Sequence, residues 1–408
     1  TLSDITANVI LADDTIGILI VRVISKEDYG IFGYASNIYS MLMLVSGFGI
    51  VSATLQIASE QSGDRNRVIN LLQYGYRFGA VFNTGISLLI LLVAILIPLP
   101  ISGSNAFLGM MFLLPVPMII KDLQIVWLRA TLQNKAYGVV NTVNALLVSL
   151  VTILGAWLLQ IRGIIIGQYV AVAAMLVLLW LRYDVPKPTK GQALSVAERK
   201  DLFGIAGISA LNNALSQLLA LLGTFVLGLV VADANIVASY KVASTIPLAL
   251  GFIPSSLMIY VYPYFAKNRT NKQWVASRYR MLVVNAGIAN LLIALIGIAL
   301  ARYIVSVVFG VQYIDAVRPF RIMMVGYFVS ATFAGIAGNL LVTQRKLKIN
   351  FYKNIAVAAL NLILNILLIP VLGFDGAAIA HLLSTIASGA ISTVAFMVVI
   401  AKLPGEIR

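Results

Sequence analysis

The segment KEDYGIFGYASNIYSMLMLVSGFG, residues 26–49, decides the fold class, because three consecutive charges end at a Tyr-Gly corner and a long apolar stretch follows. Residues 29–59 carry no charge at all. A helix needs about 20 apolar residues to cross the ~30 Å hydrocarbon core of a bilayer. Small residues such as the Gly and Ser of this stretch let helices pack closely in lipid. The segment therefore predicts a membrane-spanning helix that follows a charged turn.

The same pattern recurs along the whole chain. Of its 408 residues, 60% are hydrophobic and only 11% are charged, whereas a soluble domain carries about 25% charged residues. Further uncharged runs cover 78–120, 136–161, 163–181, 202–232, 242–266, 281–301, 322–344, 354–374 and 376–401. This repetition predicts a polytopic, all-α membrane protein. Because the chain begins at Thr1 rather than Met, we expect native residues to precede it.

Turn residues divide the uncharged runs into individual spans. The run 78–120 is too long for one helix, and PLPISGSN (98–105) within it has the Pro, Gly, Ser and Asn that are typical of a turn. Twelve transmembrane helices are predicted near 5–24, 32–58, 76–98, 106–128, 136–160, 163–181, 203–231, 236–266, 281–301, 319–343, 354–372 and 376–401.

The basic residues predict the orientation of these spans. Of the 29 Lys and Arg residues, 21 lie in loops that follow even-numbered spans or at the C-terminus. Cytoplasmic loops of membrane proteins carry the excess of Lys and Arg. Both termini are thus predicted to be cytoplasmic in a multi-pass protein of the cell inner membrane. The net charge of +14 is better explained by orientation and by anionic membrane lipids than by a nucleic-acid partner.

Two six-helix lobes are predicted, residues 1–183 and 202–408, joined by a cytoplasmic linker at 184–201. Ser195-x-x-Glu198 in this linker resembles a capping box that begins the next helix. The lobes show weak internal similarity, which pairs Tyr34 with Tyr240 and Gly163 with Gly376. Since six is an even number, both lobes would run in the same direction. They are then related by a pseudo-two-fold axis along the membrane normal, with a central cavity between them.

Two stretches carry a family resemblance. VRVISKEDYGIFGYASNIYSMLMLVSGFGIVSATLQ (21–56) resembles the start of the polysaccharide-biosynthesis (Wzx-type) flippases, in which an Arg-x-x-x-(x)-Glu-x-Tyr-Gly corner joins the first two spans. LGFDGAAIAHLLS (372–384) resembles the entry to the last span of that family. The family belongs to the multidrug/oligosaccharidyl-lipid/polysaccharide exporter superfamily. The resemblance implies twelve spans and a lipid-linked oligosaccharide substrate. The charged corner is interpreted as an outer hinge, and Gly30, Gly33, Gly47 and Gly49 as sites of close helix contact.

Charged residues inside spans are the first candidates for function, because each costs at least about 2.5–3.5 kcal/mol at the bilayer centre. Lys241 has no counterpart in the first lobe and is interpreted as lining the cavity. Lys121 either lines it or is neutralised by its neighbour Asp122. Arg22 fits the basic residue of the family or anchors span one at the interface. These three cations are candidates to bind a diphosphate.

Polar residues supply candidates for sugar binding, namely Tyr240, Asn37, Asn212 and Asn213. The single histidine, His381, is interpreted as a packed, hydrogen-bonded residue rather than one that titrates.

Asp13, Asp14 and Asp122 are candidates to bind a coupling ion. Asp13 and Asp14 lie roughly 12–13 Å inward of Arg22 at the rise of an α-helix, which places them near mid-membrane unless span one is shifted. In multidrug relatives, acidic residues of the first helix bind Na⁺ or a proton, and the resemblance implies the same role here. No other cofactor and no metal cluster is expected.

The leading hypothesis is a flippase that moves a polyprenyl-diphosphate-linked oligosaccharide, such as an O-antigen unit, from the cytoplasmic to the outer leaflet by alternating access. The alternative is a cation-coupled multidrug or metabolite exporter on the same fold. An enzyme is not expected, since no catalytic constellation appears and the outer loops are short. Polysaccharide polymerases and glycosyltransferases are the expected protein partners.

Overall fold

The computed structural model describes residues 17, 19–60, 64–183, 185–188 and 194–403. Within these ranges the regular secondary structure is helical. The helices up to the middle of the chain are α3 (Lys26–Met43), η1 (Ser46–Gly49), α4 (Ile50–Glu60), α5 (Arg65–Leu96), α6 (Ser104–Met110), α7 (Pro115–Ala130), α8 (Asn134–Arg182) and α9 (Val196–Val231). They are followed by α10 (Ala234–Ala249), α11 (Phe252–Lys267), α12 (Lys272–Ala299), α13 (Ala301–Ile304), η2 (Val305–Phe309), η3 (Val311–Ala316), α14 (Val317–Val329), η4 (Ser330–Ala334), α15 (Gly335–Thr343) and α16 (Leu347–Ala401).

The described part contains six helices that are long and apolar enough to cross a membrane, or nine if each bent pair counts as one span. The bent pairs are α3 with η1 and α4, α6 with α7, and the two parts of α9, at angles of 41°, 49° and 46°. Helices α8 and α16 each contain two of the predicted spans. The total of twelve stays a prediction, because most of the first span (5–24) lies outside the described residues.

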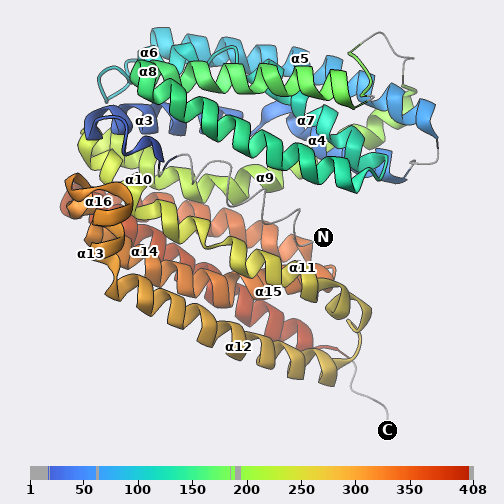
Figure 1. The fold of residues 1–408 in the computed structure, drawn as a ribbon. Coiled ribbons are helices and arrows are strands. Elements are labelled where there is room, and N and C mark those ends of the chain that lie inside the picture. The colour runs from blue at the N-terminus through green and yellow to red at the C-terminus, as the bar shows by residue number, and fades with distance from the viewer. Residues whose placement is uncertain (1–16, 18, 61–63, 184, 189–193, 404–408) are drawn as a thin grey trace. The chain divides into compact units, whose positions relative to one another are not determined.

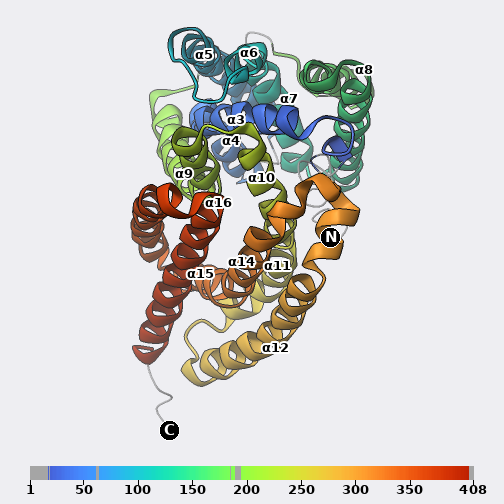
Figure 2. The same cartoon turned by 90° about the vertical axis from the view of Figure 1, so that its left-hand side faces the viewer.

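The chain divides into two compact units, and the division falls between Leu218 and Leu219, inside α9. The predicted lobes and the linker at 184–201 remain a prediction, as does the symmetry between the lobes. In the first unit, α7 packs against α4, α5 and α8 around Leu72, Leu123 and Trp127 (Figure 1). In the second unit, α14 and α15 pack against α16, and α12 packs against α14 (Figure 2).

Large apolar side chains cover the outside of both units. Val81 on α5 is 74% exposed and Trp157 on α8 is 73% exposed, and Leu292 on α12 is exposed as well. Lipid tails are as apolar as these side chains, so in a bilayer their exposure carries no hydrophobic penalty. The outer surface therefore fits a protein surrounded by lipid.

Two sharp turns interrupt the longest helices. The backbone at Gln160 in α8 (φ 53°, ψ −134°) and at Gly373 in α16 (φ 59°, ψ −136°) adopts nearly the same left-handed conformation. Three residues after each turn a glycine packs directly on backbone: a Cβ at Gly163 would collide with the carbonyl of Gly155, and one at Gly376 with that of Leu368. Gly163 and Gly376, which the sequence comparison pairs, thus have the same local backbone geometry.

The predicted close contacts are confirmed at two of the four glycines of the second span. Gly47 and Gly49 have φ of 56° and 74°, and a Cβ on Gly49 would meet the backbone of Ala206. Asn83 of α5 holds this break: its Oδ1 accepts from the Gly47 N–H at 2.7 Å, and its Nδ2 donates to the Pro115 carbonyl at 2.7 Å. A fully buried amide thereby pairs with a backbone N–H that the break leaves outside the helical ladder, and it connects the break to the start of α7.

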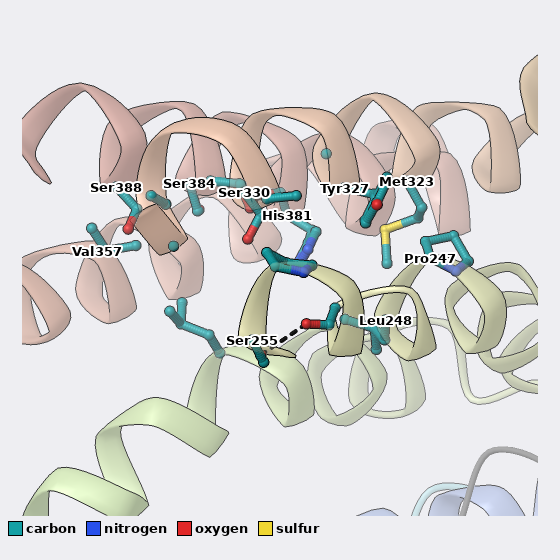
Figure 3. A pocket seen from close by; sticks show the side chains of 18 of the residues that line it. Pro247, Leu248, Ser255, Met323, Tyr327, Ser330, Val357, His381, Ser384 and Ser388 are labelled. Carbon is teal, nitrogen blue, oxygen red and sulfur yellow. Dashed lines mark hydrogen bonds between the residues drawn. The ribbon is translucent and has the colours of Figure 1, made fainter. Parts of the chain in front are cut away.

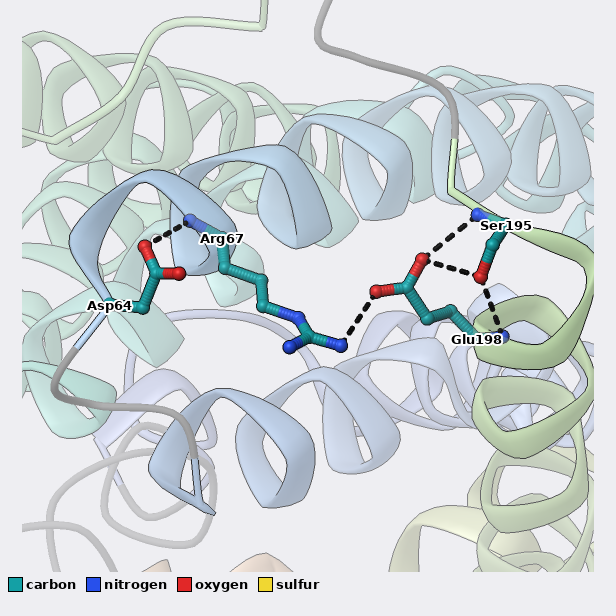
Figure 4. Close-up of polar contacts among 4 residues, drawn as sticks. All are labelled: Asp64, Arg67, Ser195 and Glu198. Carbon is teal, nitrogen blue, oxygen red and sulfur yellow. Dashed lines mark hydrogen bonds and ion pairs between the residues drawn. The ribbon is translucent and has the colours of Figure 1, made fainter.

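The predicted capping box at the start of α9 is confirmed (Figure 4). The Ser195 N–H donates to Glu198 Oε2 at 2.9 Å, and the Glu198 N–H donates to Ser195 Oγ at 3.3 Å. Arg67, near the Asp64 cap of α5, donates to the other carboxylate oxygen of Glu198 at 2.9 Å. Since both charged side chains are substantially exposed, this ion pair contributes at most about 1 kcal/mol.

Candidate functional site

A cavity of about 270 Å³ lies within the second unit, between α10, α11, α14, η4, α15 and α16. Its described lining contains no Asp, Glu, Lys or Arg. The polar residues that line it are Ser255, Tyr327, Ser330, Asn339, His381, Ser384, Thr385 and Ser388. The cavity thus offers one imidazole, one amide and several hydroxyls on an otherwise apolar wall.

Interrupted helices form one wall of the cavity. Pro247 lies near the end of α10, Gly251 separates α10 from α11, and Pro254 follows in the first turn of α11. Proline removes a backbone donor and clashes with the preceding turn, so the helix breaks at this point. Ser255 follows the break, and its hydroxyl donates to the Gly251 carbonyl at 2.9 Å. The break therefore places backbone and one hydroxyl at the cavity.

The opposite wall contains a π-helical segment, η4, between α14 and α15. Segments of this type insert an extra residue into a helix and are frequent at functional sites. Behind this wall, the Tyr327 hydroxyl donates to Asn290 Oδ1 at 3.0 Å, and Asn290 Nδ2 donates to Thr332 Oγ1 at 3.3 Å. These hydrogen bonds hold the wall in one arrangement.

A polar stripe on the second half of α16 forms the third wall (Figure 3). Ser384, Thr385 and Ser388 follow His381 by three, four and seven residues, which places the four side chains on one face of the helix. The hydroxyls of Ser384 and Thr385 donate to backbone carbonyls four residues earlier, at 2.7 and 2.8 Å. The Thr385 oxygen remains able to accept hydrogen bonds, for example from the hydroxyls of a sugar.

A buried amide network supports this stripe from behind. Asn361 Nδ2 donates to Ser384 Oγ at 3.1 Å, and Asn365 Nδ2 donates to Asn361 Oδ1 at 2.9 Å. Both asparagines are fully buried between the two halves of α16. The network fixes the position of the Ser384 hydroxyl relative to the cavity.

None of the cations predicted from the sequence lines this cavity. Lys121 is buried in α7 of the first unit, and its Nζ lies 3.5 Å from Asp122 Oδ1. Arg22 precedes α3 and is exposed. Lys241 is partly buried on α10, and its carbonyl accepts from the hydroxyl of Thr245 at 2.8 Å. The proximity of Lys121 to Asp122 fits the neutralised alternative, while the roles of all three cations remain predictions.

The predicted polar residues are spread over both units. Tyr240 is buried on α10 with its hydroxyl against Gly223, and Asn37 is buried on α3. Asn212 and Asn213 lie on α9, where Asn213 is exposed. The coupling-ion candidates Asp13 and Asp14 lie outside the described residues, and Asp122 is half exposed.

Sequence reasoning predicted a cavity between the lobes, did not predict this cavity within the second unit, and assigned His381 a packing role only. His381 lines the cavity, and Figure 3 shows its ring between Tyr327, Ser330 and Leu248. The regular spacing of polar residues from His381 to Ser392 within an otherwise apolar span is a signal that could have identified this face. The contribution of α10, α11 and η4 had no comparable signal, because it depends on how distant helices pack.

The chain shares its fold with known membrane transporters. An inward-facing multidrug resistance transporter of the MATE family in the MOP superfamily superposes with a TM-score of 0.76 at 11% identity, over 98% of this chain and 95% of that one. The lipid II flippase MurJ in an inward closed conformation gives 0.72 at 12% identity, over 96% and 87%. A MOP superfamily transporter from Pyrococcus furiosus gives 0.61 at 11% identity, over 98% and 96%.

These solved structures are transporters and a flippase, in keeping with the prediction that the chain is not an enzyme. No curated protein matches the sequence. A family model described as polysaccharide biosynthesis protein matches residues 19–318, about three quarters of the chain. The sequence match over most of its length, on a helical fold shared with MOP superfamily transporters, places this multi-pass membrane protein in the polysaccharide biosynthesis protein family.

Proposed function

We propose that the protein is a flippase that carries a polyprenyl-diphosphate-linked oligosaccharide from the cytoplasmic to the outer leaflet by alternating access. The family match supports a role in polysaccharide biosynthesis. The single observation that carries the choice of substrate is the cavity of the second unit, which combines neutral hydroxyl and amide groups with an absence of carboxylates in its described lining.

This lining suits sugars better than organic cations. A sugar presents many hydroxyls that both donate and accept hydrogen bonds, and the hydroxyl of Thr385, which donates to the His381 carbonyl, offers an acceptor to them. A cationic drug would gain most from a buried carboxylate, and none lines the described cavity. Ligand pockets for whole drug-sized molecules are about 300–1,000 Å³, so a cavity of about 270 Å³ suits one part of an oligosaccharide.

Lys241, Arg22 and Lys121 are proposed to contact the diphosphate during transport. A cation ~4 Å from a phosphate at an intermediate dielectric gains about 4 kcal/mol before desolvation is subtracted. Tyr240, Asn37, Asn212 and Asn213 are proposed to contact sugars. Asp13, Asp14 and Asp122 remain candidates for binding Na⁺ or H⁺.

The proposed orientation places both termini and residues 184–201 in the cytoplasm of a cell with an inner membrane. The chain has no Cys, so single cysteines can be introduced without background. An impermeant thiol reagent applied to intact cells should label Ser102→Cys and leave Lys187→Cys unlabelled. The opposite labelling would contradict the orientation.

The function is tested in a host that lacks its own flippase. Expression of the wild-type chain should restore surface polysaccharide, and variants of equal membrane abundance in which Lys241 and Arg22 are both changed to Ala should restore much less. Wild-type export by that double variant would reject the role of these cations. A wild-type chain that restores no polysaccharide but confers drug resistance would favour the alternative, a multidrug exporter.

A further inference from the structure

A lysine that the proposed transport mechanism does not use lies at one end of the cavity in the second unit. Lys353 is on α16, four residues before Val357, which lines the cavity. Its Nζ lies 3.2 Å from Ser392 Oγ, and Ser392 follows the lining residue Ser388 by four residues. Four residues are about one turn of an α-helix. Along both halves of α16, Lys353 therefore lies one turn beyond the hydroxyl-lined space.

The ammonium group of Lys353 has more N–H donors than its contacts with the described residues use. It can donate three hydrogen bonds, and among the described residues its contact is the neutral hydroxyl of Ser392, with no carboxylate in an ion pair. Lys353 is partly buried. A buried charge is costly unless it is paired, and packing alone does not explain a cation here.

Polar atoms from three residues converge near Gly338 beside the Lys353 Nζ. Asn350 Nδ2 donates to the Gly338 carbonyl at 2.7 Å, while its Oδ1 is buried and has no hydrogen-bond partner. A Cβ placed on Gly338 would lie 3.7 Å from both Lys353 Nζ and Asn350 Oδ1 and 4.0 Å from Ser392 Oγ. An unused acceptor and an unpaired cation thus face the same point, where glycine contributes no side chain.

We propose that Lys353, Ser392 and Asn350 form an anion subsite for a phosphate joined to a sugar, with the sugar extending into the hydroxyl-lined cavity. The Lys353 ammonium and the Ser392 hydroxyl donate to phosphate oxygens, while Asn350 Oδ1 accepts from a sugar hydroxyl. The proposal rests on the proposed function, because it assigns the phosphate to the head group of the lipid-linked substrate. A free phosphate compound shares this chemistry, so the experiment must separate the two sources.

The test uses purified full-length protein in lipid nanodiscs. The probes are geranylgeranyl diphosphate, inorganic pyrophosphate and uncharged geranylgeraniol. The wild-type chain should bind geranylgeranyl diphosphate and discriminate against geranylgeraniol. Loss of a charged hydrogen bond predicts that Lys353→Gln weakens diphosphate binding about 10-fold or more, while Lys353→Arg retains most of it. Lys348→Gln is the matched control, because Lys348 lies on the same helix and is exposed.

Equal affinities of Lys353→Gln and Lys348→Gln for the diphosphate would overturn the subsite. Binding of pyrophosphate alone, with the same dependence on Lys353, would overturn the assignment to a lipid-linked substrate. A measurement on the unaltered protein guards against variants that misfold: geranylgeranyl diphosphate should slow acetylation of Lys353 and leave that of Lys348 unchanged. Equal acetylation rates with and without the probe would also refute the proposal.

Failure of this inference is distinguishable from failure of the proposed function. If the wild-type chain restores surface polysaccharide and Lys353→Gln does so equally well with unchanged diphosphate binding, the subsite is wrong and the flippase stands. If the wild-type chain restores no polysaccharide in the flippase-deleted host, the proposed function fails whatever the binding measurements give.

Discussion

Replacing Asn83 with Ala should destabilise the first unit, because this side chain pairs with a backbone N–H freed at the break of the second span and connects the break to α7. Its Oδ1 accepts from the Gly47 N–H and its Nδ2 donates to the Pro115 carbonyl, each at 2.7 Å. Nδ2 also donates to Ser46 Oγ at 3.0 Å. Asn83 is fully buried, so neither water nor lipid can take over these bonds in the variant.

The magnitude follows from the groups left without partners. Three hydrogen bonds at the average of about 0.6 kcal/mol measured within membrane proteins give about 2 kcal/mol. Leaving the Gly47 N–H buried and unsatisfied costs about 1–3 kcal/mol, whereas the Pro115 carbonyl keeps its place in the hydrogen-bond ladder of α7. The two estimates lead us to expect a loss of about 1–3 kcal/mol in the free energy of unfolding for Asn83→Ala.

The assay is unfolding of the purified protein in mixed micelles by increasing sodium dodecyl sulfate, followed by tryptophan fluorescence. Thr84→Ala is the matched control on the same helix, since Thr84 is exposed and its hydroxyl bonds only the Ala80 carbonyl. Substitutions of this kind usually change stability by less than about 0.5 kcal/mol. If Asn83→Ala and Thr84→Ala lost the same stability, the account of the break would be refuted.

Two further predictions concern the turn in α16 and the start of α9. Gly376→Ala should sharply lower the amount of folded protein in the membrane, because the added Cβ would collide with the backbone of Leu368. Gly204→Ala should be tolerated, because no atom lies within 4 Å of the added Cβ. Equal abundance of the two variants on immunoblots would contradict this. Glu198→Ala should cost about 1 kcal/mol through loss of the capping box, and Arg67→Ala should cost less because it removes only an exposed ion pair. If Arg67→Ala lost more unfolding free energy than Glu198→Ala, the ion pair rather than the capping box would be the larger contribution.

The sequence alone was sufficient to predict the membrane class, the capping box and the family. Hydropathy and capping depend on residues that are close along the chain, so Ser195 and Glu198 could be paired from a spacing of three residues. The close backbone contact at Gly49 was also predictable in kind, because glycine in a long apolar span is typical of helix contacts. Its partner, the backbone of Ala206, was not predictable.

Only the tertiary structure decided which polar groups share a cavity. Sequence reasoning favoured charged residues inside spans and named Lys121 and Lys241, yet the cavity of the second unit is lined by hydroxyls, and the unpaired cation beside it is Lys353. Lys353 and Ser392 are far apart in the sequence and are brought together by the turn at Gly373, which folds α16 back on itself. The charge and apolar character of a span are properties of its own residues, whereas a binding site depends on which faces of different helices meet, and that is determined by packing.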